Sequence, residues 1–435
     1  MPAFLRHDAP DFEAAFAALT EAKRASDAGV DGPVAEIIAD VRARGIDAVL
    51  ALTRRFDRWD ATAETLAMSA AEIDAAIADV PSETRAALEL AAERIRAYHQ
   101  RQLPEDADWE DAAGLRLGWR WTPVDAAGLY VPGGLASYPS SLLMNAIPAA
   151  VAGVSRIVMC VPTPDGVVNP LVLLAARLSG IDTIWRMGGA QAVAALAYGA
   201  APIQPVDVIT GPGNAYVAAA KRQVFGHVGI DMIAGPSEVL VIADAENDPD
   251  LIAIDLLAQA EHDATAQSIC ITTDATFGEA VLAAVDQRLA RLQRREIAAS
   301  SWESHGGVVV ARDLAHAADL ANRIAPEHLE LAVEDPDSLA GQIRHAGAIF
   351  LGRHTPEALG DYVAGPNHVL PTAGSARFSS GLSVLDFMKR TTLTRASAAG
   401  LAAIGPAAAR LAEAESLEAH ALSVTDRLAS RKAAE

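Results

Sequence analysis

Three features of the sequence predict an α/β fold built from two similar parallel-sheet domains. Short apolar runs rich in valine and isoleucine alternate with helical segments, with a period of roughly 25 residues. A glycine or proline turn follows most of these runs. The pattern occurs twice, over 128–224 and again over 239–351. We therefore expect two incomplete Rossmann-like domains that face each other across a cleft.

The elements of the two runs follow from this alternation. In the first run we expect strands at 128–131, 157–161, 183–187 and 206–210, with helices from 139 and over 171–179, 190–198 and 215–224. In the second run we expect strands at 239–244, 268–273, 307–311 and 348–351, with helices over 249–262, 277–294 and 314–323.

Helical periodicity predominates outside the two runs. Apolar residues at helical spacing predict a short helical arm at the N-terminus, helices over 34–56 and 70–102 with a break at Pro81, and a helical tail after Arg390. The expected domain plan is 1–24 as the arm, 25–129 with 237–381 as the first α/β domain, 130–236 as the second, and 382–435 as the tail.

Composition narrows the class of protein. The chain has 435 residues, of which 51% are hydrophobic and 21% charged, as in globular proteins of more than one domain. Its formal net charge of −21 argues against a nucleic-acid partner. The most apolar run, 142–161, contains polar residues and a proline, and the N-terminus shows no secretory signal. With only two cysteines, we expect a cytoplasmic protein without a membrane or nucleic-acid partner.

The segment 360–390 is expected to be an ordered loop that forms one wall of an active site. It has neither a helical nor a strand period, and it contains two proline turns. Its many apolar residues argue against a solvated linker. Asp361, Asn367 and His368 give it groups suited to metal or proton chemistry.

Three glycine turns at expected strand ends are candidates for phosphate or cofactor binding. They lie at 132–134, 188–189 and 211–213, and each leads into an expected helix. The usual GxGxxG fingerprint of dinucleotide sites is absent. Ordinary structural turns are the alternative interpretation.

Gln259 and His262 are candidate metal ligands. They are three residues apart near the end of an expected helix, which places both side chains on one face. The alternative is a surface histidine that interacts with the helix dipole. Further ligands are available in Asp361, His368 and His420. Nitrogen and oxygen ligands without cysteine suit Zn²⁺, with Mn²⁺ or Co²⁺ as alternatives.

Glu327 and His328 are candidates for proton transfer. They are adjacent and follow Pro326, and a neighbouring glutamate and histidine are common in general acid–base catalysis. The alternative is a helix start, with proline at the first position and Glu327 favoured by the dipole. Cys160 and Cys270 lie in apolar strand runs, where thiols are usually inert.

Long motifs then point to one family. They include GLYVPGG, YPSSLLMNAIPA, GGAQAVAALAYG, GPGNAYVAAAKRQVFGHVGIDMIAGPSEVLVIAD, AQAEHD, APEHLEL, AGAIFLG, GDYVAGPNHVLPT and ARFSSGLSVLDF. In these stretches, from about residue 30 to the tail, the chain resembles the histidinol dehydrogenases.

The resemblance implies an enzyme that oxidises L-histidinol through L-histidinaldehyde to L-histidine, in the last steps of histidine biosynthesis. It implies two NAD⁺ and one water consumed per turnover, and one Zn²⁺ per subunit. It also implies an intertwined homodimer in which the C-terminal tail contributes to the partner's active site. Leu135 and His354 are small departures, since lysine and tyrosine are common there.

The resemblance also implies roles for individual residues. The implied catalytic acid/base residues are Glu327 and His328. The implied zinc ligands are Gln259, His262, Asp361 and His420, which would also surround the substrate. Further implied substrate contacts are Ser237, His328, His368 and Glu415. The implied NAD contacts are Tyr130, Gln191 and Asn214.

Two other functions remain open from the sequence. One is a related zinc- and NAD-dependent dehydrogenase of another polar alcohol, such as a sulfonated diol. The other is a zinc hydrolase that uses Glu327 or His328 on a metal-bound water. Turnover of histidinol and a requirement for NAD distinguish the three.

Overall fold

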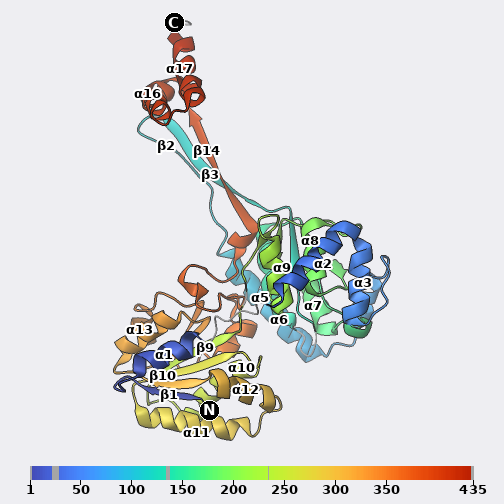
Figure 1. Ribbon diagram of the computed structural model, residues 1–435, viewed down its shortest axis with the longest axis vertical. Helices are drawn as coiled ribbons and strands as arrows, with labels where there is room; N and C mark the ends of the chain where they lie inside the picture. Colours follow the sequence, from blue (N-terminus) through green and yellow to red (C-terminus); the bar gives the residue numbers. More distant parts are fainter. Residues whose placement is uncertain (1, 22–28, 134–137, 234, 433–435) are drawn as a thin grey trace. The chain divides into compact units, whose positions relative to one another are not determined.

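The computed structural model describes residues 2–21, 29–133, 138–233 and 235–432. These residues form two units, Met1–Gln102 with Asp125–Phe387 and Leu103–Val124 with Met388–Glu435. The first unit contains two parallel sheets with helices packed against them (Figure 1), which confirms the α/β class. Leu135 lies outside the described residues.

The first parallel sheet has six strands in the order β1-β11-β10-β9-β12-β13. The strands are β1 (Ala3–Arg6), β9 (Glu238–Ala243), β10 (Gln267–Thr272), β11 (Gly307–Val310), β12 (His328–Ala332) and β13 (Ala348–Leu351). The associated helices are α1 (Phe12–Glu21), α10 (Pro249–Ala260), α11 (Ala275–Leu289), α12 (Arg295–His305), α13 (Leu314–Ile324), α14 (Pro336–Ala340) and α15 (Glu357–Leu359).

Alternating side chains explain why helices cover both faces of this sheet. Leu240 and Ile242 of β9 share an apolar core with α1 and α13, whereas Val239 and Val241 share another with α10, α11 and α12. Successive residues of a strand point to opposite faces. A strand buried on both faces needs the continuous apolar run seen here.

The second parallel sheet has five strands in the order β6-β5-β4-β7-β8. The strands are β4 (Ala126–Tyr130), β5 (Arg156–Cys160), β6 (Thr183–Trp185), β7 (Val208–Thr210) and β8 (Gly229–Ile230). The helices grouped with it are α2 (Asp31–Arg44), α3 (Ile46–Asp57), α4 (Ala70–Ile77), α5 (Ser82–Gln100), α6 (Pro139–Ala152), α7 (Pro170–Leu178), α8 (Gly189–Tyr198) and α9 (Ala215–Val224).

The expected division of the chain between the two α/β domains differs from the structure. Residues 25–129 were assigned to the domain that contains 237–381, but β4 pairs with β5 and β7 of the five-stranded sheet. Val34 and Ile38 of α2 lie in the same apolar core as α8 and α9. Periodicity identifies a helix and its apolar face, but not which sheet that face covers.

The N-terminal segment is also more than a helical arm. β1 pairs in parallel with β11 at the edge of the six-stranded sheet, and Phe12 and Phe16 of α1 are buried in its core. A four-residue strand carries too short an alternation to be recognised beside a helix. β12 was missed for a related reason, because its start was interpreted only as a proline turn or helix start.

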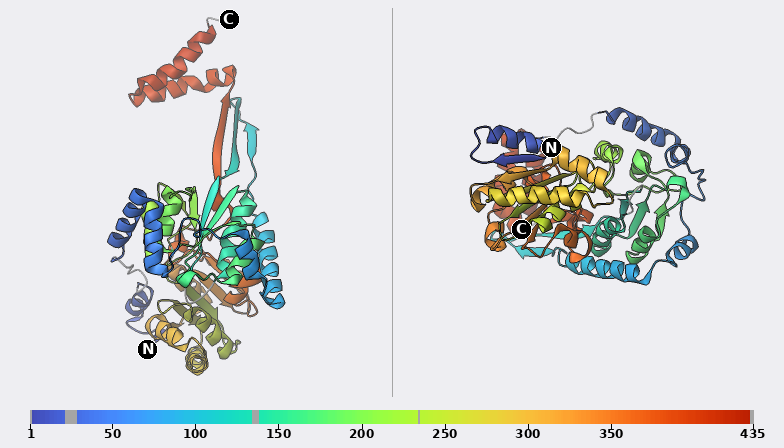
Figure 2. Two further views of the ribbon diagram at one scale, coloured as in Figure 1. Left: turned by 90° about the vertical axis from the view of Figure 1, so that its right-hand side faces the viewer. Right: turned by 90° about the horizontal axis from the view of Figure 1, so that it is seen from below.

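The second unit is an antiparallel ribbon that ends in a pair of helices. Its strands are β2 (Ala107–Glu110), β3 (Leu115–Pro123) and β14 (Met388–Ala396), in the order β14-β3-β2, followed by α16 (Ala398–Ala414) and α17 (Glu418–Lys432). Figure 2 shows the two helices as a hairpin. The expected all-helical tail from 382 is therefore wrong over β14, where three threonines favour a strand.

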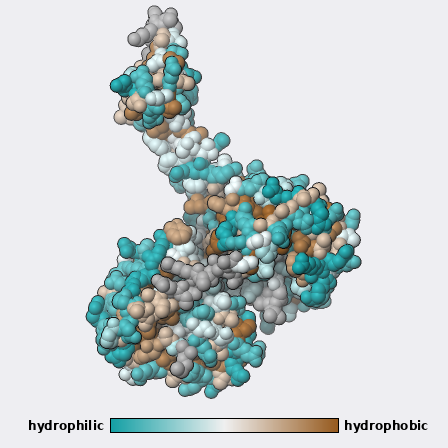
Figure 3. All heavy atoms as spheres, in the orientation of Figure 1, coloured by the Kyte–Doolittle hydropathy of each residue, from teal (hydrophilic) through white to brown (hydrophobic). Residues whose placement is uncertain are grey.

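The described helices include none with the length and apolarity needed to cross a membrane. On the face shown in Figure 3, hydrophilic residues predominate, with hydrophobic ones scattered among them. This distribution agrees with the excess of acidic over basic residues in the sequence.

Candidate active site

The predicted acid/base pair lies at the amino edge of the six-stranded sheet. His328 is the first residue of β12, directly beside the start of β9, where it is paired with Val239. Glu327 precedes it, and both side chains are buried. The backbone of Glu238 binds both: its N–H donates to Glu327 Oε2 at 2.9 Å, and His328 Nδ1 donates to its carbonyl at 3.0 Å. One residue of β9 therefore orients both groups.

His328 is surrounded by carboxylates. Its Nδ1 lies 3.3 Å from Glu357 Oε1, and its Nε2 lies 3.6 Å from Asp361 Oδ1. Burial acts to lower the pKa of His328, but the charges of Glu357, Glu327 and Asp361 outweigh it and raise the pKa well above the usual range. Because Nδ1–H is held by the Glu238 carbonyl, Nε2 is the nitrogen available for proton exchange.

Glu327 is a carboxyl with a near-neutral pKa. Burial raises the pKa to about 7, and the opposing effects of His328 and the Glu238 N–H do not cancel this. A carboxyl that titrates near neutrality is suited to act as a general base.

Gln259, His262 and Asp361 are the predicted metal ligands in this unit. Gln259 is fully buried in the last turn of α10, and neither its amide oxygen nor its amide nitrogen has a hydrogen-bond partner among the described residues. His262 follows the end of α10 and is an exposed residue, but nearby protein atoms desolvate its ring enough to lower its pKa, although Asp361 acts in the opposite direction. The Gln259 amide is therefore free to bind a metal ion or a substrate.

Asp361 lies on a π-helical turn, Gly360–Ala364, in the loop that was expected to form a wall of the site. Burial acts to raise the pKa of its carboxyl, but His328, His368 and His262 outweigh it and lower the pKa. π-helical turns occur frequently at functional sites. Asp361 therefore remains ionised beside several imidazoles.

The same loop carries His368 and is anchored on both sides. His368 Nδ1 donates to the Asp361 carbonyl at 2.8 Å, and its Nε2 lies 3.3 Å from Ser141 Oγ. Asn367 donates to the Met144 carbonyl at 2.6 Å. Arg94 donates to the carbonyls of Val363 and Ala364. The expected ordered loop is confirmed, since these bonds fix it against α5 and α6.

The remaining predicted site residues are separated between the two units. Ser237 lies in the first unit and directly precedes β9, whose first residue binds the acid/base pair. Glu415 ends α16 and His420 lies in the first turn of α17, so both belong to the second unit, where their side chains are exposed.

Sequence interpretation missed a set of buried acids behind the catalytic pair. Glu357 is almost fully buried, and its N–H donates to Glu330 Oε1 at 2.6 Å. Oxygen and nitrogen atoms of His328, Glu357 and Asp361 lie within 4.8 Å of one another, which makes them an alternative metal-binding group. Burial and then the Asp255 charge raise the pKa of Glu330 to about 8. Glu357 follows Pro356 at a helix start, where an acid is normally surface-exposed, so the sequence carried no signal.

The three predicted NAD contacts lie at the carboxyl edge of the five-stranded sheet. Tyr130 ends β4, and its hydroxyl accepts from the Gly189 N–H at 3.0 Å. Gln191 is buried on α8, with no partner for its Oε1 among the described residues. Asn214 caps α9 by accepting from the N–H groups of Tyr216 and Val217. The turns 188–189 and 211–213, each followed by a helix N-terminus, thus lie at one edge, as in nucleotide sites.

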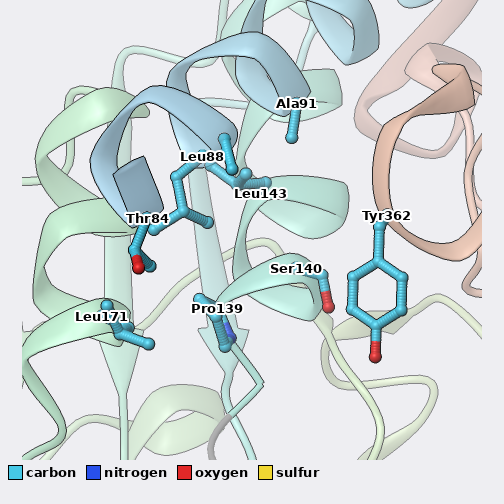
Figure 4. Close-up of a pocket in the computed structure, with 9 residues that line it drawn as sticks. Thr84, Leu88, Ala91, Pro139, Ser140, Leu143, Leu171 and Tyr362 are labelled. Carbon is cyan, nitrogen blue, oxygen red and sulfur yellow. The ribbon is translucent and has the colours of Figure 1, made fainter. Parts of the chain in front are cut away.

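A separate apolar pocket lies beside the loop. It is lined mainly by α5 and α6, with Leu171 of α7 and the ring of Tyr362, which lies beside Ser140 (Figure 4). The described residues that line it include no charged one. A polar, cationic ligand is therefore better matched by the carboxylates around Asp361 than by this pocket.

Comparison with known proteins agrees with the geometry. The family model for histidinol dehydrogenase matches residues 20–428. The chain belongs to the histidinol dehydrogenase family. It is 68% identical to histidinol dehydrogenase from Ruegeria pomeroyi over 98% of this chain and 99% of that protein. It is 69% identical to the protein from Cereibacter sphaeroides with the same coverage. The crystal structure of histidinol dehydrogenase from Elizabethkingia anophelis superimposes with a TM-score of 0.93 at 36% identity, covering 99% of both chains.

Membership of the histidinol dehydrogenase family extends over both units. The matched range includes every predicted site residue, from Tyr130 in the five-stranded sheet to His420 in α17. The resemblance inferred from the motifs is therefore confirmed at the level of the family.

Proposed function

We propose that this chain oxidises L-histidinol to L-histidine through L-histidinaldehyde, with NAD⁺ as the electron acceptor and Zn²⁺ in the site. Family membership over residues 20–428 is the observation that carries the proposal. The chemistry of the site supports it, because ionised Asp361 and nearby carboxyls suit a substrate with an ammonium group and an imidazole.

The donor set at the amino edge of the six-stranded sheet fits a zinc ion. Gln259 offers an unpartnered buried amide, His262 an imidazole whose lowered pKa favours the neutral form, and Asp361 a charged carboxylate. We propose His420 as the fourth ligand. When bound, Zn²⁺ supplies an electrophilic anchor for the nitrogens of the substrate. Ser237, His368 and Glu415 are proposed to contact the substrate.

The edge of the five-stranded sheet fits a dinucleotide. A Cβ atom on Gly211 would lie 2.0 Å from the Tyr130 carbonyl oxygen, and one on Gly188 would lie 2.4 Å from Pro162 Cγ. Only glycine lets these turns pack so closely against neighbouring chain just before α8 and α9, and helix N-termini favour a pyrophosphate. When bound, NAD⁺ supplies the hydride acceptor. Tyr130, Gln191 and Asn214 are proposed to contact it.

Proton transfer falls to His328 and Glu327. His328, with its Nδ1–H on the Glu238 carbonyl, exchanges a proton with the hydroxyl group of histidinol at Nε2. Because its pKa is raised well above the usual range, the imidazole must first release its Nε2 proton before it can accept one from the substrate. Glu327, with a pKa of about 7, then takes a proton from the water that adds to the aldehyde. The Glu238 N–H donates to Oε2 of Glu327, which leaves Oε1 of Glu327 for the water.

We also propose that the protein acts as a homodimer in the cytoplasm. Exchange of α16 and α17 between subunits would give the exposed Glu415 and His420 a role in a shared site. Cys160 and Cys270 are free thiols, which agrees with a reducing compartment.

The test is an assay of NADH formation with L-histidinol beside other polar alcohols, including a sulfonated diol. We expect histidinol to be preferred and L-histidine to accumulate. Failure to oxidise histidinol would overturn the proposal. Hydrolytic activity without NAD would instead support the zinc hydrolase.

A further inference from the structure

A buried ion pair lies beneath the third glycine turn. Lys221 is on α9 and Asp231 follows β8, and their side chains are only 3% and 1% exposed. The ammonium group and the carboxylate are in direct contact. Neither residue belongs to the proposed catalytic, metal or NAD-contacting set.

Both ions bind backbone groups of the same residue of the turn, Gly211. Asp231 Oδ2 accepts from the Gly211 N–H at 2.8 Å, and Lys221 Nζ donates to the Gly211 carbonyl at 2.9 Å. Gly211 has a φ of 115°, and a Cβ there would meet the Tyr130 carbonyl oxygen. The turn is thus hydrogen-bonded to the ion pair and packed against the end of β4.

Stability alone does not explain such a pair. The free energy lost in desolvating two buried charges offsets most of the free energy gained from their attraction. Apolar residues of the same volume commonly stabilise a protein as well or better. The two charges cancel each other, so the pair adds little field to attract a pyrophosphate. What it provides is a fixed orientation of the two peptide groups on either side of Gly211, and therefore of the chain that continues to Asn214.

We propose that Lys221 and Asp231 are positioning residues for the dinucleotide: they fix the 211–214 turn in the conformation that binds NAD⁺. The inference rests on the proposed NAD dependence. Because both polar groups of Gly211 are already bound, the contacts to the dinucleotide come from the residues that follow it, 213–214, and not from the Gly211 N–H.

The test is calorimetric titration of NAD⁺ into the purified full-length protein, which does not depend on turnover. The variant Lys221→Met with Asp231→Asn removes both charges and keeps the volume. We expect it to bind NAD⁺ at least about tenfold more weakly, the value of roughly one charge-assisted hydrogen bond. Its zinc content and its KM for histidinol should match the wild type, while its KM for NAD⁺ rises.

Two further variants separate positioning from general destabilisation. Leu173 is buried on α7, which connects β5 and β6 at the opposite end of the sheet from β7 and β8. Leu173→Ala creates a cavity there and should lower the melting temperature without changing NAD⁺ affinity. If the double variant does not fold, the single variant Asp231→Asn replaces it in the NAD⁺ titration. The Asn oxygen cannot serve both the Gly211 N–H and the ammonium as two carboxylate oxygens do, so we expect weakening of several-fold.

The outcomes are distinct. Wild-type affinity for NAD⁺ in a folded double variant, or in Asp231→Asn, would overturn the positioning role. Equal weakening in Leu173→Ala would assign the effect to stability and overturn it too. Absence of NAD⁺ binding by the wild type would instead refute the proposed function.

Discussion

The two parallel sheets of the first unit carry their polar residues at opposite edges. In the five-stranded sheet the glycine turns and Tyr130 lie at the carboxyl edge, where α8 and α9 begin. In the six-stranded sheet Glu327 and His328 lie at the amino edge, and Gln259 lies in the last turn of α10, which ends at Ala260. Helix N-termini attract anions and helix C-termini attract cations. The first edge therefore suits a pyrophosphate, and the second suits a metal ion and a cationic substrate.

This contrast indicates that two similar sheets need not carry their candidate binding residues at the same edge. Ligands of open parallel sheets usually bind at the carboxyl ends of the strands, and the five-stranded sheet agrees with that rule. The proposed metal and substrate site lies instead at the amino ends of the six-stranded sheet, where β9 and β12 begin side by side and α10 ends before β10. If the two edges have separate tasks, zinc content and NAD⁺ affinity should change independently of each other.

The largest effect is expected from the metal ligands. Either His262→Asn or Asp361→Asn should lower zinc content and bring activity close to background, because each removes one of few ligands. NAD⁺ affinity should remain near the wild-type value. Metal analysis and calorimetry on the same preparations provide the measurement, and full zinc content in both variants would refute the ligand assignment.

The next effect is expected at Glu327. Glu327→Gln should slow oxidation of the aldehyde by roughly 10²–10⁴-fold, through loss of the base that activates water, and slow oxidation of the alcohol much less. The two half-reactions are followed separately with histidinol and histidinaldehyde. Glu330→Gln is the matched control, since Glu330 has a pKa of about 8 and is largely protonated at neutral pH. Equal losses in both half-reactions would point to a positional role for Glu327.

A smaller effect is expected at the carboxyl edge of the five-stranded sheet. Gly211→Ala forces a side chain into a left-handed conformation and against the Tyr130 carbonyl oxygen. The strain of about 1–3 kcal/mol should shift the turn and weaken NAD⁺ binding, with zinc content unchanged. Gly180→Ala, also at positive φ but with open space around its Cβ, is the control. Loss of zinc in Gly211→Ala would contradict the separation of the two edges.

The sequence predicted much of this arrangement, but not how its parts are shared between sheets. Glycine turns at strand ends identified the carboxyl edge, and adjacent Glu327 and His328 stood out beside a proline. The helices over 34–56 and 70–102 were predicted but assigned to the wrong sheet, because the apolar face of a helix does not indicate which sheet it packs against. Glu357 and Glu330 were missed because burial of an acid depends on tertiary packing, which brings β12 and α15 together.

Those buried acids provide the last and smallest expected effect, which concerns stability. Burial and Asp255 raise the pKa of Glu330 from about 4.5 in an unfolded chain to about 8 in the protein. Between these values the folded state binds more protons than the unfolded state, so the contribution of Glu330 to stability falls as pH rises. The amide introduced by Glu330→Gln cannot ionise, so that variant does not undergo this loss.

We therefore expect Glu330→Gln to be more stable than the wild type at about pH 8, and the difference to shrink towards about pH 5. Urea unfolding at the two pH values measures it. Glu334→Gln, an exposed acid on the segment after β12, is the control and should show no such trend. A difference that grows as pH falls would show that Glu330 is ionised in the folded protein, and the environment behind His328 would then be more polar than its burial implies.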